Sequence, residues 1–152
     1  MKKSVILSMI CLFLLLAVIA GCKGESYIKT EYIKGKVTWN GEAVAGADVT
    51  FHPKASEGVP ASGITNAQGE FELYAVGGKP NGGAVAGDYI VTVTKKSNDT
   101  QEVPDPNSSG GVRIIGTSKL LTPKDYSEKK TSPVEATVKS GKNDPLVIDL
   151  KD

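Results

Sequence analysis

Alternating apolar and polar residues after position 32 restrict this chain to a fold built from strands. Residues 33–39 (IKGKVTW) place an apolar or small residue at every second position, and residues 88–96 do the same with Tyr89, Val91 and Val93. A period of two is typical of a strand with one buried face, whereas a helix needs a period near 3.6. The sequence beyond residue 22 has no helical periodicity of useful length. We therefore expect an all-β body.

Turn signals divide this body into short strands. Asn40-Gly41 and residues 66–69 contain residues that tolerate a positive φ, as tight turns between strands require. We expect about seven strands, the others lying within residues 47–52, 61–65, 70–74, 136–138 and 146–150. Short strands separated by turns predict a sandwich or a barrel. The residues expected to face the core are Val37, Trp39, Val49, Phe51, Phe71, Leu73, Tyr89, Val91 and Val93.

Two segments are expected to be long loops. One is the glycine-rich stretch 77–87 (GGKPNGGAVAG). The other spans residues 97–118, because residues 97–111 (SNDTQEVPDPNSSGG) consist largely of Asn, Asp, Pro, Ser and Gly, and only Val112–Ile115 suggests a brief strand. Loops on a rigid scaffold often carry function, so we expect any duty specific to this chain to lie in these two segments.

The first 22 residues have the order of an export signal. Lys2 and Lys3 precede an almost wholly apolar run from Val5 to Ala20, and Gly21 leads directly to Cys22. This order is that of a secretory signal peptide. An uncleaved transmembrane helix is the alternative, since the run is close to the ~17–25 residues that span a bilayer. Residues 19–22 (IAGC) resemble the bacterial lipobox, in which the cysteine thiol receives a diacylglyceryl group, and this resemblance favours cleavage before Cys22.

A domain organisation follows from this resemblance. Residues 1–21 would be removed as a lipoprotein signal peptide, residues 22–32 would form a lipidated tether, and residues 33–152 would form the β-body. Two or three acyl chains on Cys22 would hold the protein on a membrane, because a single chain gives only reversible binding. We expect an extracytoplasmic body anchored to the cell membrane or to an outer membrane. Lys23 favours the outer membrane where one exists, because it is not the Asp that signals inner-membrane retention.

Composition narrows the range of partners. Removal of 21 of the 152 residues leaves 131, and the loss of Lys2 and Lys3 lowers the basic residues from 18 to 16, against 17 acidic ones. Such a balanced chain has no positive field to attract nucleic acid, so we expect no nucleic-acid partner. Cys22 would be the only remaining cysteine, and its sulfur would carry the lipid. No intramolecular disulfide is then possible, and the β-body must be stable through its core alone.

The motifs of the body, taken in order, resemble the carboxypeptidase regulatory-like domain. They are Gly35–Gly41 (GKVTWNG), Val44–Phe51 (VAGADVTF), Thr65–Phe71 (TNAQGEF) and Gly87–Val93 (GDYIVTV). The resemblance covers roughly residues 33–152, and the C-terminal part is similar to small bacterial lipoproteins that are numerous in planctomycete-like bacteria. It implies a Greek-key β-sandwich of transthyretin-like, or prealbumin-like, fold. Ala43 departs from the proline often found in the family, and the 97–118 segment is longer than a minimal domain needs.

Few residues offer chemistry. His52 is the only histidine, and strand alternation places it on the face opposite Phe51, where we expect it to meet solvent. The candidate acids of an active site are Asp99, Glu102, Asp105 and Asp125, and those of the loop lack the spacing of a calcium-binding loop. The glycines of 77–87 are followed by no helix, which argues against a phosphate cradle. We expect no enzyme, no metal and no cofactor, and Cys22 as the one modified residue.

Two functions remain open from the sequence. The first is a non-catalytic β-sandwich that acts as a structural or protein-interaction module of the cell envelope, with a protein partner in trans or a glycan. The alternative is a lipoprotein that binds a carbohydrate or another small ligand through the 77–87 and 97–118 loops. Tyr74 and Tyr126 are the aromatic residues expected to be exposed enough for such a contact, whereas Trp39 and Tyr89 fit the core.

Mass spectrometry of the chain purified from native membranes tests the export prediction. We expect a polypeptide that begins at Cys22 and carries the added mass of two or three acyl chains, because the lipobox-like segment directs acylation and cleavage. An N-terminus at Met1, or a free thiol at Cys22, would contradict this prediction.

Overall fold

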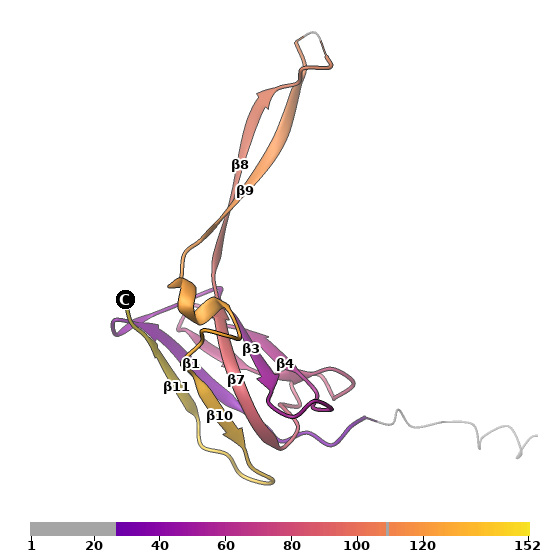
Figure 1. The fold of residues 1–152 in the computed structure, drawn as a ribbon, viewed down its shortest axis with the longest axis vertical. Helices are drawn as coiled ribbons and strands as arrows, with labels where there is room; N and C mark the ends of the chain where they lie inside the picture. Colours follow the sequence, from indigo (N-terminus) through magenta and orange to yellow (C-terminus); the bar gives the residue numbers. More distant parts are fainter. Residues whose placement is uncertain (1–26, 109) are drawn as a thin grey trace, which may run out of the picture.

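A computed structural model of the chain describes residues 27–108 and 110–152 and is shown in Figure 1. The expected signal peptide, Cys22 and the first part of the expected tether lie outside the described residues. The described residues form two sheets packed face to face and one long hairpin that leaves them (Figure 1). Among these residues, no helix is long and apolar enough to cross a membrane.

The first sheet is built around β1 (Lys34–Trp39). Strand β11 (Leu146–Leu150) pairs with it in parallel on one side. On the other side, β2 (Glu42–Ala43) and β5 (Glu70–Glu72) pair with it in antiparallel fashion. The turn between β1 and β2 is the predicted Asn40-Gly41, and both residues have a positive φ. Because β1 has partners along both edges, its outer face is the only part of it open to a ligand.

The second sheet has the order β10–β7–β3–β4–β6, and every neighbouring pair is antiparallel. Its members are β10 (Glu135–Val138), β7 (Gly87–Thr94), β3 (Asp48–Pro53), β4 (Ala61–Ile64) and β6 (Tyr74–Ala75). Strand β7 is the longest of the five and lies between β3 and β10. It therefore forms the rigid axis of this sheet.

Side chains from the facing surfaces of the two sheets fill one core. Val37, Phe71 and Ile148 reach it from the first sheet, and Phe51 and Tyr89 from the second. The ring of Phe51 lies 6.5 Å from that of Phe71 and 5.6 Å from that of Tyr89, in tilted arrangements that suit aromatic pairs. The tyrosine hydroxyl donates a hydrogen bond to the carbonyl of Val85, so its burial leaves no unpaired polar group.

The predicted all-β sandwich is confirmed. Each expected strand of the body is present, and two strands of two residues each, β2 and β6, add to the predicted set. All of the expected core residues are buried except Trp39, which is only partly buried. Trp39 ends β1 at the rim of the core, and its indole nitrogen donates a hydrogen bond to the carboxylate of Asp152. An indole at the rim keeps a polar partner that a central position would not offer.

The prediction of a loop over residues 97–118 is wrong. These residues form an antiparallel hairpin of β8 (Lys96–Pro104) and β9 (Val112–Leu120), in which each strand has nine residues. Several of the turn-type residues that suggested a loop, among them Ser97, Asp99 and Pro104, lie within β8. Others follow it towards the tip, residues 105–111, where the side chain of Asp105 accepts a hydrogen bond from the amide of Asn107. Among the residues from 97 to 119 whose burial the structure describes, none belongs to the buried core. Both faces of the hairpin are exposed. Neither face therefore requires apolar residues at every second position, and the sequence shows no alternating pattern there.

The hairpin continues the axis of the second sheet. Lys95 alone separates β7 from β8. At the base, the amide of Lys95 bonds to the hydroxyl of Thr122 and its carbonyl accepts from the amide of Leu121. The short 3₁₀ helix η2 (Lys124–Ser127) then returns the chain to the body. Nine residues of antiparallel strand span about 30 Å, and Figure 1 shows the arm rising well clear of the sheets.

Excision of the arm tests this division of the structure. We expect replacement of residues 97–119 by Asn-Gly, which suits a two-residue turn, to leave the free energy of unfolding within about 2 kcal/mol of the parent, because shortening a connection changes only its closure entropy. Phe51→Ala is the matched positive control and should cost about 3–5 kcal/mol. Both are measured by urea denaturation. A loss from excision as large as that from Phe51→Ala would mean that the arm supports the sandwich.

Candidate functional site

His52 does not meet solvent freely, contrary to expectation. It lies on the outer face of the second sheet, opposite Phe51, as predicted, but it is half-buried. Its Nε2 atom lies 2.9 Å from the hydroxyl of Thr92 on the neighbouring strand. Burial, with a smaller effect from the nearby Lys129, lowers the pKa of the imidazole below its usual range. His52 therefore acts as a neutral cross-strand partner of Thr92.

The four candidate acids do not converge. Asp99 and Glu102 are three residues apart on β8, so strand alternation directs them to opposite faces of the hairpin. The carboxylate of Asp105 binds a backbone amide within the tip, and Asp125 lies on η2, beyond the base of the hairpin. In the described part of the chain, no three acidic, histidine or cysteine side chains gather as a metal site would require. The four carboxylates therefore form no common cluster in the described part of the chain.

The glycine-rich segment 77–87 holds the N-terminal segment against the body. The amide of Ile28 donates to the carbonyl of Gly77, and Glu31 and Ala84 exchange two backbone hydrogen bonds. Gly83 lies so close to Glu31 that a β-carbon at Gly83 would overlap the Glu31 carbonyl oxygen. The Glu31 carboxylate accepts from the amide of Gly141, which is the main cause of its lowered pKa. Residues 28–32 of the expected tether are thus part of the folded body.

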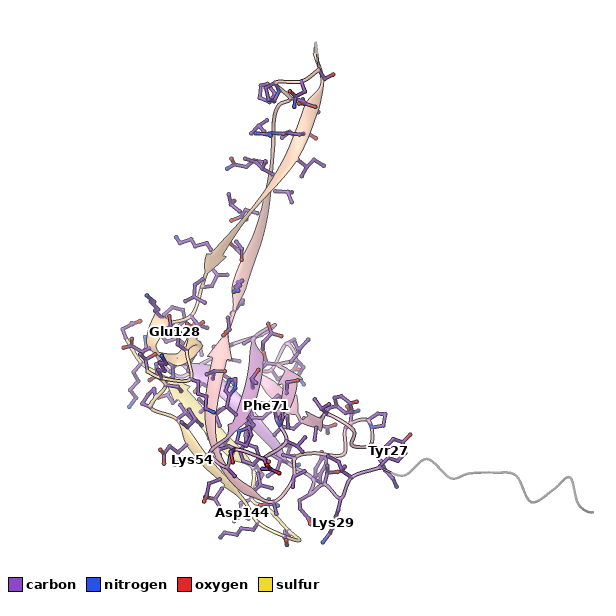
Figure 2. The ribbon with its side chains drawn as sticks, turned by 45° about the vertical axis from the view of Figure 1, so that its right-hand side comes forward. Tyr27, Lys29, Lys54, Phe71, Glu128 and Asp144 are labelled. Carbon is purple, nitrogen blue, oxygen red and sulfur yellow. The ribbon has the colours of Figure 1, made fainter. Side chains whose placement is uncertain are left out.

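The hairpin exposes aliphatic side chains close to its tip. Val112 and Ile114 are 63% and 69% exposed, and both lie on one face of β9. On the opposite face, Ile115 is 37% exposed. It lies opposite Gln101 on β8 and therefore diagonal to Val103, which shares this face. Figure 2 shows that side chains stand away from both sides of the arm and that no element of the body lies beside its outer part. Aliphatic groups clustered at the end of a projecting element are typical of an interaction site.

The two edges of the hairpin carry opposite charge. The acidic residues Asp99 and Glu102 lie on β8, and the basic residues Arg113 and Lys119 lie on β9. Lys96, the one basic residue of β8, lies at its base, paired with Leu120. In the described part of the chain the two strands pair only with each other, so each has one edge with unpaired backbone groups. The arm therefore presents one acidic edge and one basic edge.

A second candidate site is a groove of about 760 Å³ on the outer face of β1 and β5. The β1–β5 register places Lys34 opposite Glu72 and Lys36 opposite Glu70, and Tyr32 and Tyr74 both line the groove.

The tyrosines of the groove are 50% and 43% exposed. The hydroxyl of Tyr32 donates to the carboxylate of Glu72, and this bond raises the pKa of the phenol. Asn66 donates to Glu70, and Asn81 and Ser62 complete the polar lining. The groove combines exposed aromatic faces with polar groups of balanced charge. Residues 97–118 take no part in its lining or in that of the smaller hollow beside Trp39.

The hairpin and the groove differ in how much of each site is predictable from the sequence. The sequence predicts that Tyr74 lies at the surface, but it places Tyr32 in the tether. Nothing in the sequence marks Tyr32 as part of the groove that both tyrosines line. The opposite charges of β8 and β9 were readable in the sequence once the strands were known. The signal that could have revealed the strands is the spacing of Val103, Val112 and Ile114 around the turn residues 105–111.

Comparisons with family models, with curated proteins and with solved structures give no significant match for this chain.

Proposed function

We propose that this chain is a lipid-anchored, extracytoplasmic lipoprotein whose non-catalytic β-sandwich serves as a protein-interaction module of the cell envelope. Cys22 is the proposed site of lipidation and the membrane the proposed location, as the lipobox-like segment suggests. The contacts of Ile28 with the body support a short connection. The six residues from Cys22 to Ile28 reach at most about 20 Å, so the body would lie close to the membrane surface.

The observation that carries the proposal is the isolated hairpin. A two-stranded sheet without other packing is marginally stable in water. Here such a sheet has nine residues in each strand, exposes Val112 and Ile114, and adds nothing to the core. Exposed strand edges and aliphatic side chains invite pairing with another chain. The presence of such an arm, despite its exposed apolar surface, supports a partner that covers it.

We also propose that the body belongs to the carboxypeptidase regulatory-like family, with a Greek-key, transthyretin-like connectivity. The support is the placement of the motifs within one sandwich. The Gly35–Gly41 motif covers β1 and its turn, Val44–Phe51 leads into β3, and Gly87–Val93 falls on β7. The hairpin is then an addition to the family's domain, inserted where β7 would otherwise end.

Crosslinking followed by purification from detergent-solubilised membranes tests the interaction role. The tagged full-length chain is compared with the variant in which Asn-Gly replaces residues 97–119. We expect one stoichiometric protein partner with the parent and at least a tenfold loss with the excised variant, since removal of hot-spot contacts commonly costs 2 kcal/mol or more, or about thirtyfold in affinity. Equal recovery of the partner with both chains would contradict the proposed role of the arm.

A second candidate function is binding of a neutral glycan, and the groove on β1 and β5 favours it. Tyr32 and Tyr74 offer exposed ring faces on which sugar rings can stack, and Asn66 and Asn81 offer amides that hydroxyl groups can bind. Two lysines and two glutamates leave the groove without net charge, so it matches an uncharged polyhydroxylated ligand. The groove differs from the ligand site that the sequence predicts on the 77–87 and 97–118 segments. Of the residues in these two segments, only Asn81 lines the groove.

Titration with a panel of neutral oligosaccharides, followed by calorimetry, tests this candidate. We expect binding by the parent chain and its loss in the double variant Tyr32→Ala with Tyr74→Ala, because each ring contributes stacking area that the groove cannot replace. Ile114→Ala, on the hairpin, is the control and should bind as the parent does. Binding that survives loss of both tyrosines, or no binding by the parent to any member of the panel, would remove the groove from consideration.

A further inference from the structure

The free edges of the hairpin limit what kind of partner can cover them. Within the described residues, β8 and β9 each lack a neighbour on the outer side. Addition of a strand to only one edge would leave the other edge exposed. A partner that presents two complementary edges of its own would cover both, and closure into a ring leaves no edge free.

We propose that the partner of the hairpin is a second copy of this chain, with β9 of each copy paired to β8 of the next. This inference deepens the proposed interaction role and rests on it. Each copy supplies one acidic edge, with Asp99 and Glu102, and one basic edge, with Arg113 and Lys119. A row of copies joined in this way places a basic strand beside an acidic strand at every junction. With the tips level, Lys119 of one copy lies on the same face as Asp99 of the next and diagonal to it, and opposite charges across neighbouring strands are favourable.

Orientation supports the same arrangement. Copies that share the proposed anchor at Cys22 would direct their arms the same way from one membrane. When two hairpins point the same way, β9 of one runs antiparallel to β8 of its neighbour, as an antiparallel sheet requires. Symmetric pairing of two arms would instead place β8 against β8, so that an acidic strand lies beside another acidic strand. The other symmetric pairing places β9 against β9, so that the strands that carry Arg113 and Lys119 lie side by side. Like charges across strands are unfavourable.

The apolar residues near the tip fit this arrangement too. Arms that point the same way hold their tips at one level, so Val112 of one copy would lie opposite Pro104 of the next, with Ile114 on the same face and diagonal to that Pro104. Val112 and Ile114 are the most exposed aliphatic residues of the arm. Their burial between copies removes apolar surface from water, and this adds to the backbone pairing.

Disulfide crosslinking between two differently tagged copies in intact membranes tests the pairing. Parent chains would carry no thiol besides the lipidated Cys22, so an introduced cysteine is unique. One copy carries Thr100→Cys on β8, and the other carries Ile114→Cys, Gly116→Cys or Ser118→Cys on β9. We expect a mixed dimer on mild oxidation for at least one of these partners, because paired strands hold α-carbons about 4.5–5.5 Å apart, within disulfide range.

Single-variant membranes provide the matched control. Copies that all carry Thr100→Cys should give at least tenfold less dimer, since β8 does not meet β8. Dimer formation by Thr100→Cys alone at the level of the mixed pair would overturn the proposed pairing, as would absence of mixed dimer for all three β9 positions.

Charge exchange provides an independent test with its own rescue. A copy with Arg113→Glu and Lys119→Glu has two acidic edges, and a copy with Asp99→Lys and Glu102→Lys has two basic ones. Crosslinking is read between Thr100→Cys on one copy and Gly116→Cys on another, never both on one chain, because these positions are paired within a hairpin. We expect membranes that hold either charge variant alone to lose about tenfold in crosslinking, and co-expression of the two variants to restore it. Restoration also shows that both variants fold. Failure of the mixture to regain crosslinking would count against complementary edges as the basis of association.

These outcomes separate this inference from the broader proposal. If the arm captures another protein in the membrane purification but no copy-to-copy crosslink forms, the homotypic inference is wrong and the interaction role stands. If excision of residues 97–119 leaves capture unchanged, and no copy-to-copy crosslink forms between intact arms, both are wrong.

Discussion

The structure depends on the position of β7 between β3 and β10. Tyr89, Val91 and Val93 bury one face of this strand against the first sheet, while β10 pairs with Gly87–Ile90 on one edge and β3 pairs with Tyr89–Thr94 on the other. A strand fixed in this way cannot bend where it leaves the sandwich, and the bonds between Lys95 and Thr122 and between Leu121 and Lys95 hold its continuation in line. The packing of the core therefore sets the direction of an arm that itself takes no part in the core.

The body was predictable because each of its strands has one buried face. Val49 and Phe51 alternate with exposed or half-exposed residues on β3, and the same pattern on β7 and β11 reveals which side faces inward. The hairpin was not predictable by the same means. Asp99, Thr100 and Gln101 meet water whichever way they point, so their order carries no periodic signal, and the turn residues 105–111 dominate the composition of the segment.

The two candidate sites follow from the same division between body and arm. The groove lies on the outer face of the first sheet, where Tyr32 reaches it only because Glu31 and Ala84 hold the N-terminal segment in line with β1. The arm lies at the far end of β7, away from Tyr27 and Lys29 (Figure 2). A body held near a membrane by its N-terminal segment can thus use the groove and the arm for different partners, because neither surface covers the other.

Amide hydrogen exchange along β8 and β9, measured on the lipidated chain in membranes, tests most directly whether the arm pairs with neighbouring copies. Within one hairpin, alternate amides bond across the pair and the others point outward. If arms join edge to edge, the outward amides of both strands exchange as slowly as the inward ones, and dilution of the protein in detergent returns them to fast exchange. Outward amides that exchange freely at every protein density would show that both edges remain unpaired, and the account of the arm would then fail.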